Sequence, residues 1–399
     1  MDTRELKAQI EAVGFDEVRF AQVDDVPSGE FLQWLEDGWQ ADMNWLDRTA
    51  EKRLNPDLVL PGVKSLIMLG VSYWPGEGDP STQRRWAKYS LYSDYHDTLL
   101  EGLKKVGKIL EEKFDISSTD YRFYTDAGPV IERGWAAKAG MGWQGKNGML
   151  ISRKHGNWLL LASVLTTVEL EPDPPLMKSS LRKMEGESSL GLNCGKCTSC
   201  LEACPTEAIP KPGLIDARRC ISYHTIENKG VIPRGFRAAI GSRIFGCDIC
   251  LDVCPWNRFA KKGRQLLLSS RYDVVPLTLL ELLAMTQERF SEVFRKSPIK
   301  RTKIRGLLRN ACIVAGNLNE SQEWVQGVEG EQQLVLDQLL LLAGHELAMV
   351  RVHAVWAVFR LSGKEGFDLL KSARKGEVDS EVLAEYEWWE SEALSGSMV

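Results

Sequence analysis

The stretch CGKCTSCLEACP, residues 194–205, decides how the middle of this chain folds. Its four cysteines are separated by two, two and three residues, and a proline follows the last of them. This is the spacing of bacterial two-cluster ferredoxins, in which three thiolates bind one cubane and the fourth, carried away on a helix, ligates its neighbour. The stretch therefore predicts a ferredoxin-like domain that binds two 4Fe-4S clusters.

A second run of cysteines supplies the remaining ligands. It reads GCDICLDVCPWN over residues 246–257, again ends in Cys-Pro, and is preceded by the isolated Cys220. Because the last cysteine of each run ligates the cluster of the other run, the thiolates separate into two sets. The predicted sets are Cys194, Cys197, Cys200 and Cys254 for one cluster, and Cys204, Cys220, Cys247 and Cys250 for the other.

Structural zinc is the alternative interpretation of these cysteines, because paired Cys-x-x-Cys units bind zinc in many ribbon domains. A structural zinc site needs only four thiolates and requires neither three cysteines at two-residue spacing nor the prolines that follow the last cysteine of each run. We therefore give the zinc interpretation roughly one chance in twenty. The ninth cysteine, Cys312, lies in an apolar helical stretch. We expect it to be a core residue.

Composition is that of a soluble globular protein. The chain has 399 residues, of which 44% are hydrophobic and 26% charged, and its net charge is -5. Its first residues carry charges where a signal peptide needs an apolar stretch, and no segment approaches the ~18 apolar residues of a membrane span. Clustered cysteines in a reducing compartment indicate metal rather than disulfides. We expect a cytoplasmic monomer without membrane contact.

Apolar periodicity divides the chain into four parts. Residues 1–170 alternate strand and helix patterns, including a helix between Asp94 and Phe114, and predict an α/β domain. Residues 171–193 are rich in Pro, Ser and charge and are expected to form a linker or surface excursion. The cysteine domain follows at 194–265. Residues 266–399 have helical periodicity throughout and predict an all-α domain.

A weak repeat occurs within the helical part. Arg309 and Ala315 have the same spacing as Arg351 and Ala357, and the two pairs are 42 residues apart. This period is that of HEAT-type repeats, in which each unit is a pair of helices. We therefore predict a HEAT-like repeat domain at the C-terminal end.

Several separated motifs, taken together and in order, resemble the epoxyqueuosine reductase family. They are EKRLNPDLVLPGVKSL from residue 51, TDAGPVIERGWAAKAGMGWQGKNGMLI from 125, CGKCTSCLEACPTEAI from 194, RRCISYHTIE from 218 and FGCDICLDVCPWN from 245. The resemblance extends over nearly the whole chain. It implies a cobalamin-dependent enzyme that completes queuosine in tRNA.

The resemblance implies a cobalamin in the α/β domain beside the nearer cluster. The epoxide of a modified wobble guanosine is then reduced to an alkene with loss of water, and an unidentified low-potential donor supplies the electrons. Asp126 occupies the family's proton-donor position. An epoxide oxygen leaves poorly as an alkoxide, so we expect the pKa of Asp126 to be raised by burial. A helix N-cap is the alternative role for this aspartate.

The cofactor contacts that the resemblance implies come from several parts of the chain. They are Arg53, Asp126, Gln144, Lys146, Leu150, Ser222 and Gly246. For Arg53 the alternative is a surface salt bridge. Two residues depart from the family pattern, since Ala127 stands where Thr is usual and His224 where an apolar residue is typical.

No Asp-x-His-x-x-Gly cobalamin motif is present. Asp94-Tyr95-His96 begins like one, but Leu99 stands where the glycine should be. We therefore expect His96 to be structural and the cobalamin to lack a protein histidine ligand.

Binding of tRNA needs a basic surface, because neutralised phosphates provide most sequence-independent affinity. Residues 295–309 contain seven basic residues and no acidic one, and residues 229–264 contain eight against two. On composition alone such runs are solvated faces at about even odds, but the family's substrate favours RNA contact. The predicted contacts are Lys229, Lys300, Arg301, Lys303 and Arg305. We expect the target base to be flipped out of its stack.

Two other functions fit part of this pattern. A cobalamin-dependent reductive dehalogenase also has a corrin domain beside two clusters, but needs no basic helical tail. A ferredoxin-like electron carrier would leave Asp126 and the basic stretches without a purpose.

Overall fold

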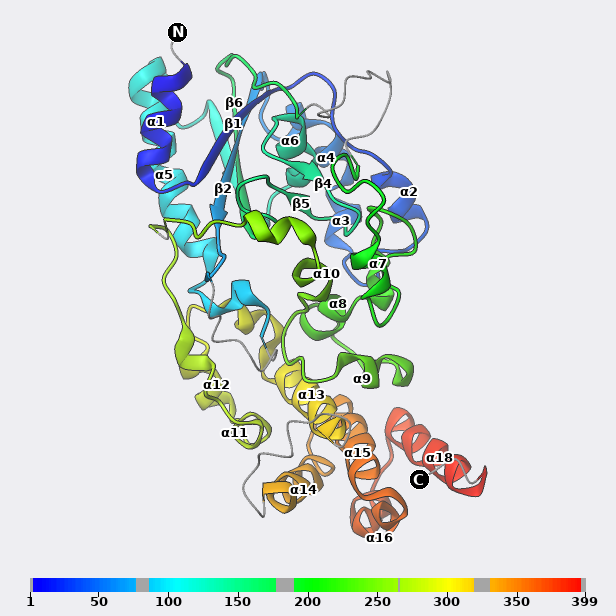
Figure 1. Ribbon diagram of the computed structural model, residues 1–399. Coiled ribbons are helices and arrows are strands. Elements are labelled where there is room, and N and C mark those ends of the chain that lie inside the picture. Colours follow the sequence, from blue (N-terminus) through cyan, green and yellow to red (C-terminus); the bar gives the residue numbers. More distant parts are fainter. Residues whose placement is uncertain (1–2, 77–85, 177–189, 265, 319–330, 396–399) are drawn as a thin grey trace. The chain divides into compact units, whose positions relative to one another are not determined.

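The structure is a computed structural model, and Figure 1 follows its chain from the N-terminus to the C-terminus. It describes residues 3–76, 86–176, 190–264, 266–318 and 331–395. Most of the predicted linker, residues 177–189, lies outside the described residues.

The chain forms two compact units that each combine distant segments. The first unit comprises Met1–Asp79, Tyr92–Cys220 and Asp248–Ser270. The second comprises Pro80–Leu91, Ile221–Cys247 and Arg271–Val399.

A four-stranded sheet organises the first unit. Its strands, in spatial order, are β1 (Glu17–Gln22), β2 (Ser65–Ser72), β6 (Leu159–Thr166) and β3 (Tyr121–Tyr124), and each neighbouring pair is antiparallel. Since β2 and β3 are both antiparallel to β6, they run in the same direction. The long helix α5 (Tyr95–Phe114) connects them, which makes a β-α-β unit with β6 inserted between its strands. The expected combination of strands and helices is confirmed, but every described pairing within this sheet is antiparallel.

The remaining elements of the first unit are short. A two-stranded ribbon pairs β4 (Trp143–Gln144) with β5 (Leu150–Ile151). The helices besides α5 are α1 (Thr3–Val13), α2 (Phe31–Glu36), α3 (Trp45–Arg48), α4 (Ala50–Leu54), α6 (Glu132–Lys138), α7 (Ser199–Glu202) and α10 (Ile249–Asp252).

Helix α5 begins and ends where its sequence predicts. Asp94 caps the N-terminus, because its side chain accepts a hydrogen bond from the backbone N–H of His96 at 3.0 Å. At the other end Asp115 adopts the left-handed conformation with φ 53°. The buried face has apolar residues three and four apart, as in an amphipathic helix. These are Leu99, Leu103, Val106 and Leu110.

The second unit is helical. Its helices are α8 (Ile221–Ile226), α9 (Arg234–Ile240), α11 (Leu279–Leu283), α12 (Gln287–Val293), α13 (Lys303–Gly316), α14 (Glu331–Leu342), α15 (Ala348–Ser362), α16 (Gly366–Leu369), α17 (Lys371–Lys375) and α18 (Ser380–Ser395). Helices α13 and α15 pack against each other in the centre of one hydrophobic core. Cys312 is fully buried in α13, which confirms its expected core position.

Arg309 belongs to the basic stretch at 295–309, which we expected to form a basic surface, and for this residue the expectation is wrong. Its side chain is fully buried in the second unit. The guanidinium donates to the backbone carbonyls of His224 at 2.6 Å, Asn228 at 2.7 Å and Gly230 at 2.9 Å. Because desolvation lowers the pKa of Arg309 to about 9 and its donors are used internally, this arginine stabilises the fold rather than a charged surface.

No helix within the described ranges is both long enough and apolar enough to span a lipid bilayer.

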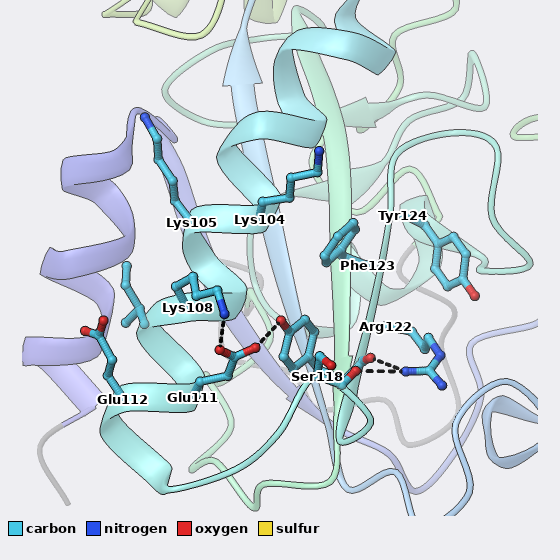
Figure 2. Close-up of a pocket in the computed structure, with 11 residues that line it drawn as sticks. Lys104, Lys105, Lys108, Glu111, Glu112, Ser118, Arg122, Phe123 and Tyr124 are labelled. Carbon is cyan, nitrogen blue, oxygen red and sulfur yellow. Dashed lines mark hydrogen bonds and ion pairs between the residues drawn. The ribbon is translucent and has the colours of Figure 1, made fainter.

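Helix α5 and strand β3 line a groove of ≈ 720 Å³, which Figure 2 shows, and their side chains contact each other along it. The Tyr121 hydroxyl donates to Glu111 Oε1 at 2.8 Å, and Lys108 forms an ion pair with the same carboxylate at 2.5 Å. Gly107 makes this approach possible, since a Cβ there would lie 2.5 Å from the Tyr121 hydroxyl oxygen and 2.7 Å from its ring. The glycine thus sets how closely the helix lies to the edge strand.

We predict that Gly107→Ala destabilises the fold although alanine has the higher helix propensity. The added methyl group must displace the buried Tyr121 ring, and overpacking of this kind costs ~1–3 kcal/mol. Urea unfolding should report a lower midpoint. Gly376→Ala is the matched control, because nothing lies within 4 Å of a Cβ at that position. Equal stability of Gly107→Ala and wild type would contradict the proposed role of the glycine.

Candidate functional site

Asp126 lies just beyond the end of strand β3 in a strained conformation. Its φ is 57°, in the left-handed region that residues other than glycine rarely adopt. Its backbone N–H donates to Glu132 Oε1 at 3.3 Å. Helix α6 begins at Glu132 with Ile131 as its N-cap, so the alternative role of Asp126 as a helix cap is wrong. Strain of this size at a polar residue is typical of functional sites.

The first turn of α5 brings two side chains to this aspartate. The Tyr95 hydroxyl donates to Asp126 Oδ2 at 2.8 Å. His96 Nε2 lies 3.7 Å from the same oxygen, while His96 Nδ1 lies 2.8 Å from Asp94 Oδ1. His96, which we expected to be only structural, therefore lies between two carboxylates, one of which is the predicted proton donor.

This arrangement reverses the expected titration of Asp126. Pairing with His96 is the largest influence, and it holds the pKa of Asp126 below its usual value against the opposing effect of desolvation. The prediction of a raised pKa is therefore wrong. Desolvation works against the charged imidazole, but the interactions with Asp126 and Asp94 outweigh it and raise the pKa of His96 to about 9.

Three further charged side chains surround Asp126. Arg53 on α4 donates from Nη1 to the carbonyl of Val130 at 2.8 Å, and desolvation lowers its pKa against the attraction of Glu132 and Asp126. Desolvation and the charge of Asp126 raise the pKa of Glu132 to about 8. Arg133 donates to the carbonyl of Gly148 at 2.6 Å and attracts both carboxylates. Arg53 and Asp126, predicted from separate motifs, thus come together.

The β4–β5 ribbon carries three predicted cofactor contacts. Gln144 and Leu150 are register partners, and Leu150 is buried in a hydrophobic cluster of the first unit. The side chain of Lys146 binds the protein itself, because its ammonium donates to the carbonyls of Gly195 at 2.8 Å and Cys197 at 2.9 Å. This lysine fastens the ribbon to the first cysteine loop.

Four cysteines of the first unit lie within electrostatic reach of one another. Desolvation comes first among the effects that raise the pKa of Cys200 to about 11, followed by the negative charges of neighbouring thiolates. The pKa of Cys254 is also raised, by desolvation first, against a hydrogen bond with Asn157. The interacting thiols are Cys194, Cys197, Cys200 and Cys254, the first predicted ligand set.

The other predicted ligands are divided between the units. Cys204 accepts a hydrogen bond from the backbone N–H of Ala208 at 3.3 Å. Cys204, Cys220 and Cys250 belong to the first unit, and Cys247 is the last residue of its segment in the second. Within the described residues no three His, Cys, Asp or Glu side chains converge on a single-ion site. Thiolates on a cubane bind different irons and stand further apart than those around one ion.

The remaining predicted contacts belong to the second unit. Ser222 lies on α8, and the backbone N–H of Gly246 donates to the Thr225 hydroxyl at 3.0 Å. Two features exclude a side chain at Gly246. The φ of this residue is 75°, and a Cβ there would lie 2.5 Å from the Cβ of Ala87. His224, which departs from the family pattern, is buried beside the Phe236 ring.

The predicted RNA contacts also lie in the second unit. Lys229, Lys300 and Lys303 are exposed and Arg305 is half-buried. Arg301 is exposed but paired, since its guanidinium lies 2.8 Å from Glu227 Oε2.

Comparison with protein families supports the interpretation of the cysteine pattern. The family profile described as a 4Fe-4S double cluster binding domain matches residues 193–257. The chain therefore contains a 4Fe-4S binding domain, which makes it an iron–sulfur protein.

A second profile, described as epoxyqueuosine reductase QueG, DUF1730, matches residues 53–127, from Arg53 to just past Asp126. Epoxyqueuosine reductase of Aliivibrio fischeri is 34% identical over 361 residues, which is 88% of this chain and 90% of that protein. The enzyme of Vibrio cholerae is 36% identical over 329 residues, 79% of this chain and 85% of its own length. The chain belongs to the epoxyqueuosine reductase family.

Solved structures agree with this assignment. A crystal structure of epoxyqueuosine reductase with an epoxyqueuosine-modified tRNA-Tyr stem loop has a TM-score of 0.79, 28% identity and 97% coverage of both chains. The Streptococcus thermophilus enzyme has a TM-score of 0.74 and 25% identity, covering 98% of this chain and 99% of its own. Family membership makes the chain an oxidoreductase and removes the electron-carrier alternative.

We predict that Lys146→Met weakens cluster retention. The substitution removes two charge-assisted hydrogen bonds to the loop that carries Cys197, each worth ~1.5–3 kcal/mol. Iron and sulfide per chain, measured after anaerobic reconstitution and gel filtration, should fall. Lys196→Met is the control, because Lys196 is an exposed lysine of the same loop. Equal iron content in both variants and wild type would show that the loop does not need this anchor.

Proposed function

We propose that this protein reduces epoxyqueuosine to queuosine at the wobble position of tRNA, using cobalamin supplied with electrons by two 4Fe-4S clusters. Family membership supports the reaction, and the match to a relative solved with an epoxyqueuosine-modified stem loop supports the substrate. The observation that carries the proposal is the carboxylate of Asp126, held by Tyr95 and His96 among charged side chains. Removal of an epoxide oxygen requires an acid at that oxygen.

The chemistry sets a proton requirement that these side chains fit. Conversion of an epoxide to an alkene and water consumes two electrons and two protons. Asp126 gives a proton to the oxygen as its bond to carbon breaks. Glu132 lies beside Asp126, and its pKa of about 8 lets it hold the second proton at neutral pH. Arg53 and Arg133 offset the negative charge that remains when a carboxyl gives up its proton.

The cysteine set fits two cubanes. Eight half-buried free thiols with ferredoxin spacing are the donors that 4Fe-4S clusters require. We propose the two ligand sets given above. The mutual charge effects among Cys194, Cys197, Cys200 and Cys254 support the first set. The second set draws on Cys247, which is three residues from Cys250 in the sequence.

The surroundings of Asp126 fit a cobalamin without a histidine ligand. When bound, cobalamin supplies a low-valent metal centre able to reduce the substrate. The Asp126 side chain is 68% exposed, although protein around it desolvates it and its neighbours. Both nitrogens of His96 face carboxylates, so its imidazole is not turned toward a metal.

We propose that the corrin contacts are Arg53, Asp126, Gln144, Lys146, Leu150, Ser222 and Gly246. For Lys146 and Leu150 we assign these contacts to the backbone, because the ammonium of the lysine and the side chain of the leucine are already engaged.

The organisation of the chain follows from the same proposal. We propose a cobalamin domain at 1–170, an iron–sulfur domain at 194–265 and a HEAT-like domain at 266–399. The two arginines of the predicted repeat both donate to backbone carbonyls, which supports the repeat. Arg309 on α13 donates to the carbonyl of Asn228, and Arg351 on α15 donates to the carbonyl of His345, just before its own helix. We further propose a cytoplasmic monomer that takes electrons from a low-potential donor.

Reconstitution with iron, sulfide and cobalamin under anaerobic conditions tests the function. With a strong reductant and epoxyqueuosine-containing tRNA, mass spectrometry of the nucleosides should detect loss of one oxygen from the modified base. Asp126→Asn should lower the single-turnover rate by ~10²- to 10⁴-fold, the usual contribution of a general acid. Asp97→Asn, an exposed carboxylate on α5, is the control. Wild-type rates in Asp126→Asn, or zinc in place of iron, would refute the proposal.

Salt dependence tests the proposed RNA contacts. Each phosphate contact adds about 0.7–0.9 to the slope of log affinity against log salt. The double variant Lys300→Gln, Lys303→Gln should therefore lower the slope for tRNA by ~1.5 in fluorescence anisotropy titrations. Lys364→Gln changes an exposed lysine elsewhere in the second unit and serves as the control. A slope unchanged by the double variant would exclude these lysines from the RNA interface.

A further inference from the structure

We propose that His96 supplies the proton that Asp126 delivers, and that Asp94 holds the imidazole in the orientation needed for this transfer. The inference rests on the proposed function, because it concerns the source of the proton in that reaction. His96 acts through Asp126 and is therefore a positioning and proton-supplying residue rather than one that touches the substrate.

The contacts form a continuous chain from Asp94 to Asp126. Asp94 Oδ1 accepts from the backbone N–H of His96 at 3.0 Å and lies 2.8 Å from Nδ1 of the same residue. These two contacts fix both the helix start and the imidazole ring. The Tyr95 ring stacks on the imidazole with centroids 4.2 Å apart. Only Nε2 is then left to face Asp126 Oδ2, at 3.7 Å.

The two oxygens of Asp126 have different surroundings. Oδ2 receives the Tyr95 hydroxyl and faces His96. Within the ranges that the structure describes, no side chain or backbone group donates to Oδ1. Oδ2 is thus the oxygen that can receive a proton from the protein. A carboxyl group rotates or shifts its proton between oxygens, so Oδ1 can present it to a substrate.

The charges around the pair decide where the proton is stored. Asp94, Asp126 and Tyr95 face His96, and Arg53, Glu132 and Arg133 act on Asp126. The pKa of Asp126 lies below its usual value and that of His96 is about 9. At neutral pH the aspartate is therefore ionised and the imidazole protonated. An acid of ordinary aspartate strength has no proton to give there, so it needs a neighbour that does.

The transfer balances with the groups present. A proton moves from His96 Nε2 to Asp126 Oδ2, and Asp126 passes it to the epoxide oxygen as the carbon–oxygen bond breaks. The electrons are those of the proposed reduction. His96 is left neutral and regains a proton from water, which reaches its side chain because 41% of it is exposed. The separation of 3.7 Å is long for a direct transfer, but such contacts tighten when substrate binds.

A purely structural ion pair would use the same contacts, and pH separates the two roles. With the relay, replacing His96 removes the proton store that faces Asp126 Oδ2. Glu132 contacts the backbone N–H of Asp126 instead and holds the second proton, so Asp126 must take up the first proton itself, with a far lower pKa than the imidazole. The resulting defect must then grow as pH rises from acid to neutral. A structural defect would be the same at every pH.

The first arm of the test does not depend on activity. Diethyl pyrocarbonate acylates neutral imidazole, so its reaction rate with His96, followed by peptide mass spectrometry on the full-length anaerobic holoenzyme, reports the protonation of that residue. We expect half-maximal reactivity near pH 9 in wild type. In Asp94→Asn and Asp126→Asn the midpoint should fall toward ~6.5. Asp97→Asn, the neighbouring exposed carboxylate, should behave as wild type. An ordinary midpoint in wild type would overturn the relay.

The second arm measures single-turnover reduction across pH in His96→Gln and wild type. We expect a loss of ~10²-fold or more at neutral pH that shrinks toward parity at acid pH. A loss independent of pH would overturn the relay while leaving the proposed function intact. Absence of turnover in loaded wild type would instead overturn the proposed function, and the labelling midpoints would still report the pairing of His96 with its two carboxylates.

Discussion

The approach of helix α5 to strand β3 is the constraint on which the candidate site depends. The helix begins with Tyr95 and His96, and the strand ends just before Asp126. Neither element carries a complete site by itself. Gly107, just over three helical turns further along α5, and Tyr121 fix their separation with a contact that a single added methyl group would disturb. A small change in this packing therefore alters the distance between the imidazole and the carboxylate.

Charge and strain at this junction act together. Asp126 has a positive φ, which costs of the order of 1–3 kcal/mol when it is not a glycine. Its backbone N–H bonds to Glu132, and its side chain bonds to Tyr95 and pairs with His96. These contacts offset the cost of the conformation and turn the carboxylate toward the groups that control its proton. The strained backbone is thus linked directly to the electrostatics of the site.

What the sequence predicts well depends on local spacing. The cysteine runs, the core position of Cys312 and the helix from Asp94 to Phe114 all follow from patterns of a few residues. The site around Asp126 depends on contacts between α4, α5, β3 and α6, and no local pattern encodes those. The incomplete Asp-x-His-x-x-Gly motif was thus a poor guide to His96, because it addressed only metal ligation.

Burial also could not be read from composition. Arg309 belongs to a strongly basic stretch in the sequence, yet its helix turns it into the core, where three carbonyls accept from it. For Asp126, burial alone predicts a weaker acid, but the imidazolium of His96, 3.7 Å from the carboxylate, matters more than desolvation. The sign of the pKa shift is thus a property of the tertiary structure.

Storage of protons away from the delivering acid has a physical advantage for a site that must also accept a charged substrate. An aspartate kept protonated by burial would have to lie in apolar surroundings, where neither a polar nucleoside nor water could reach it. Here the acid stays accessible, and two neighbouring groups hold protons beside it: His96, with a pKa of about 9, and Glu132, with a pKa of about 8. One is a cation and the other a neutral acid, so the two stores differ in charge. When both have given up a proton, His96 is neutral and Glu132 is an anion, and Arg53 and Arg133 offset the repulsion between the two carboxylates.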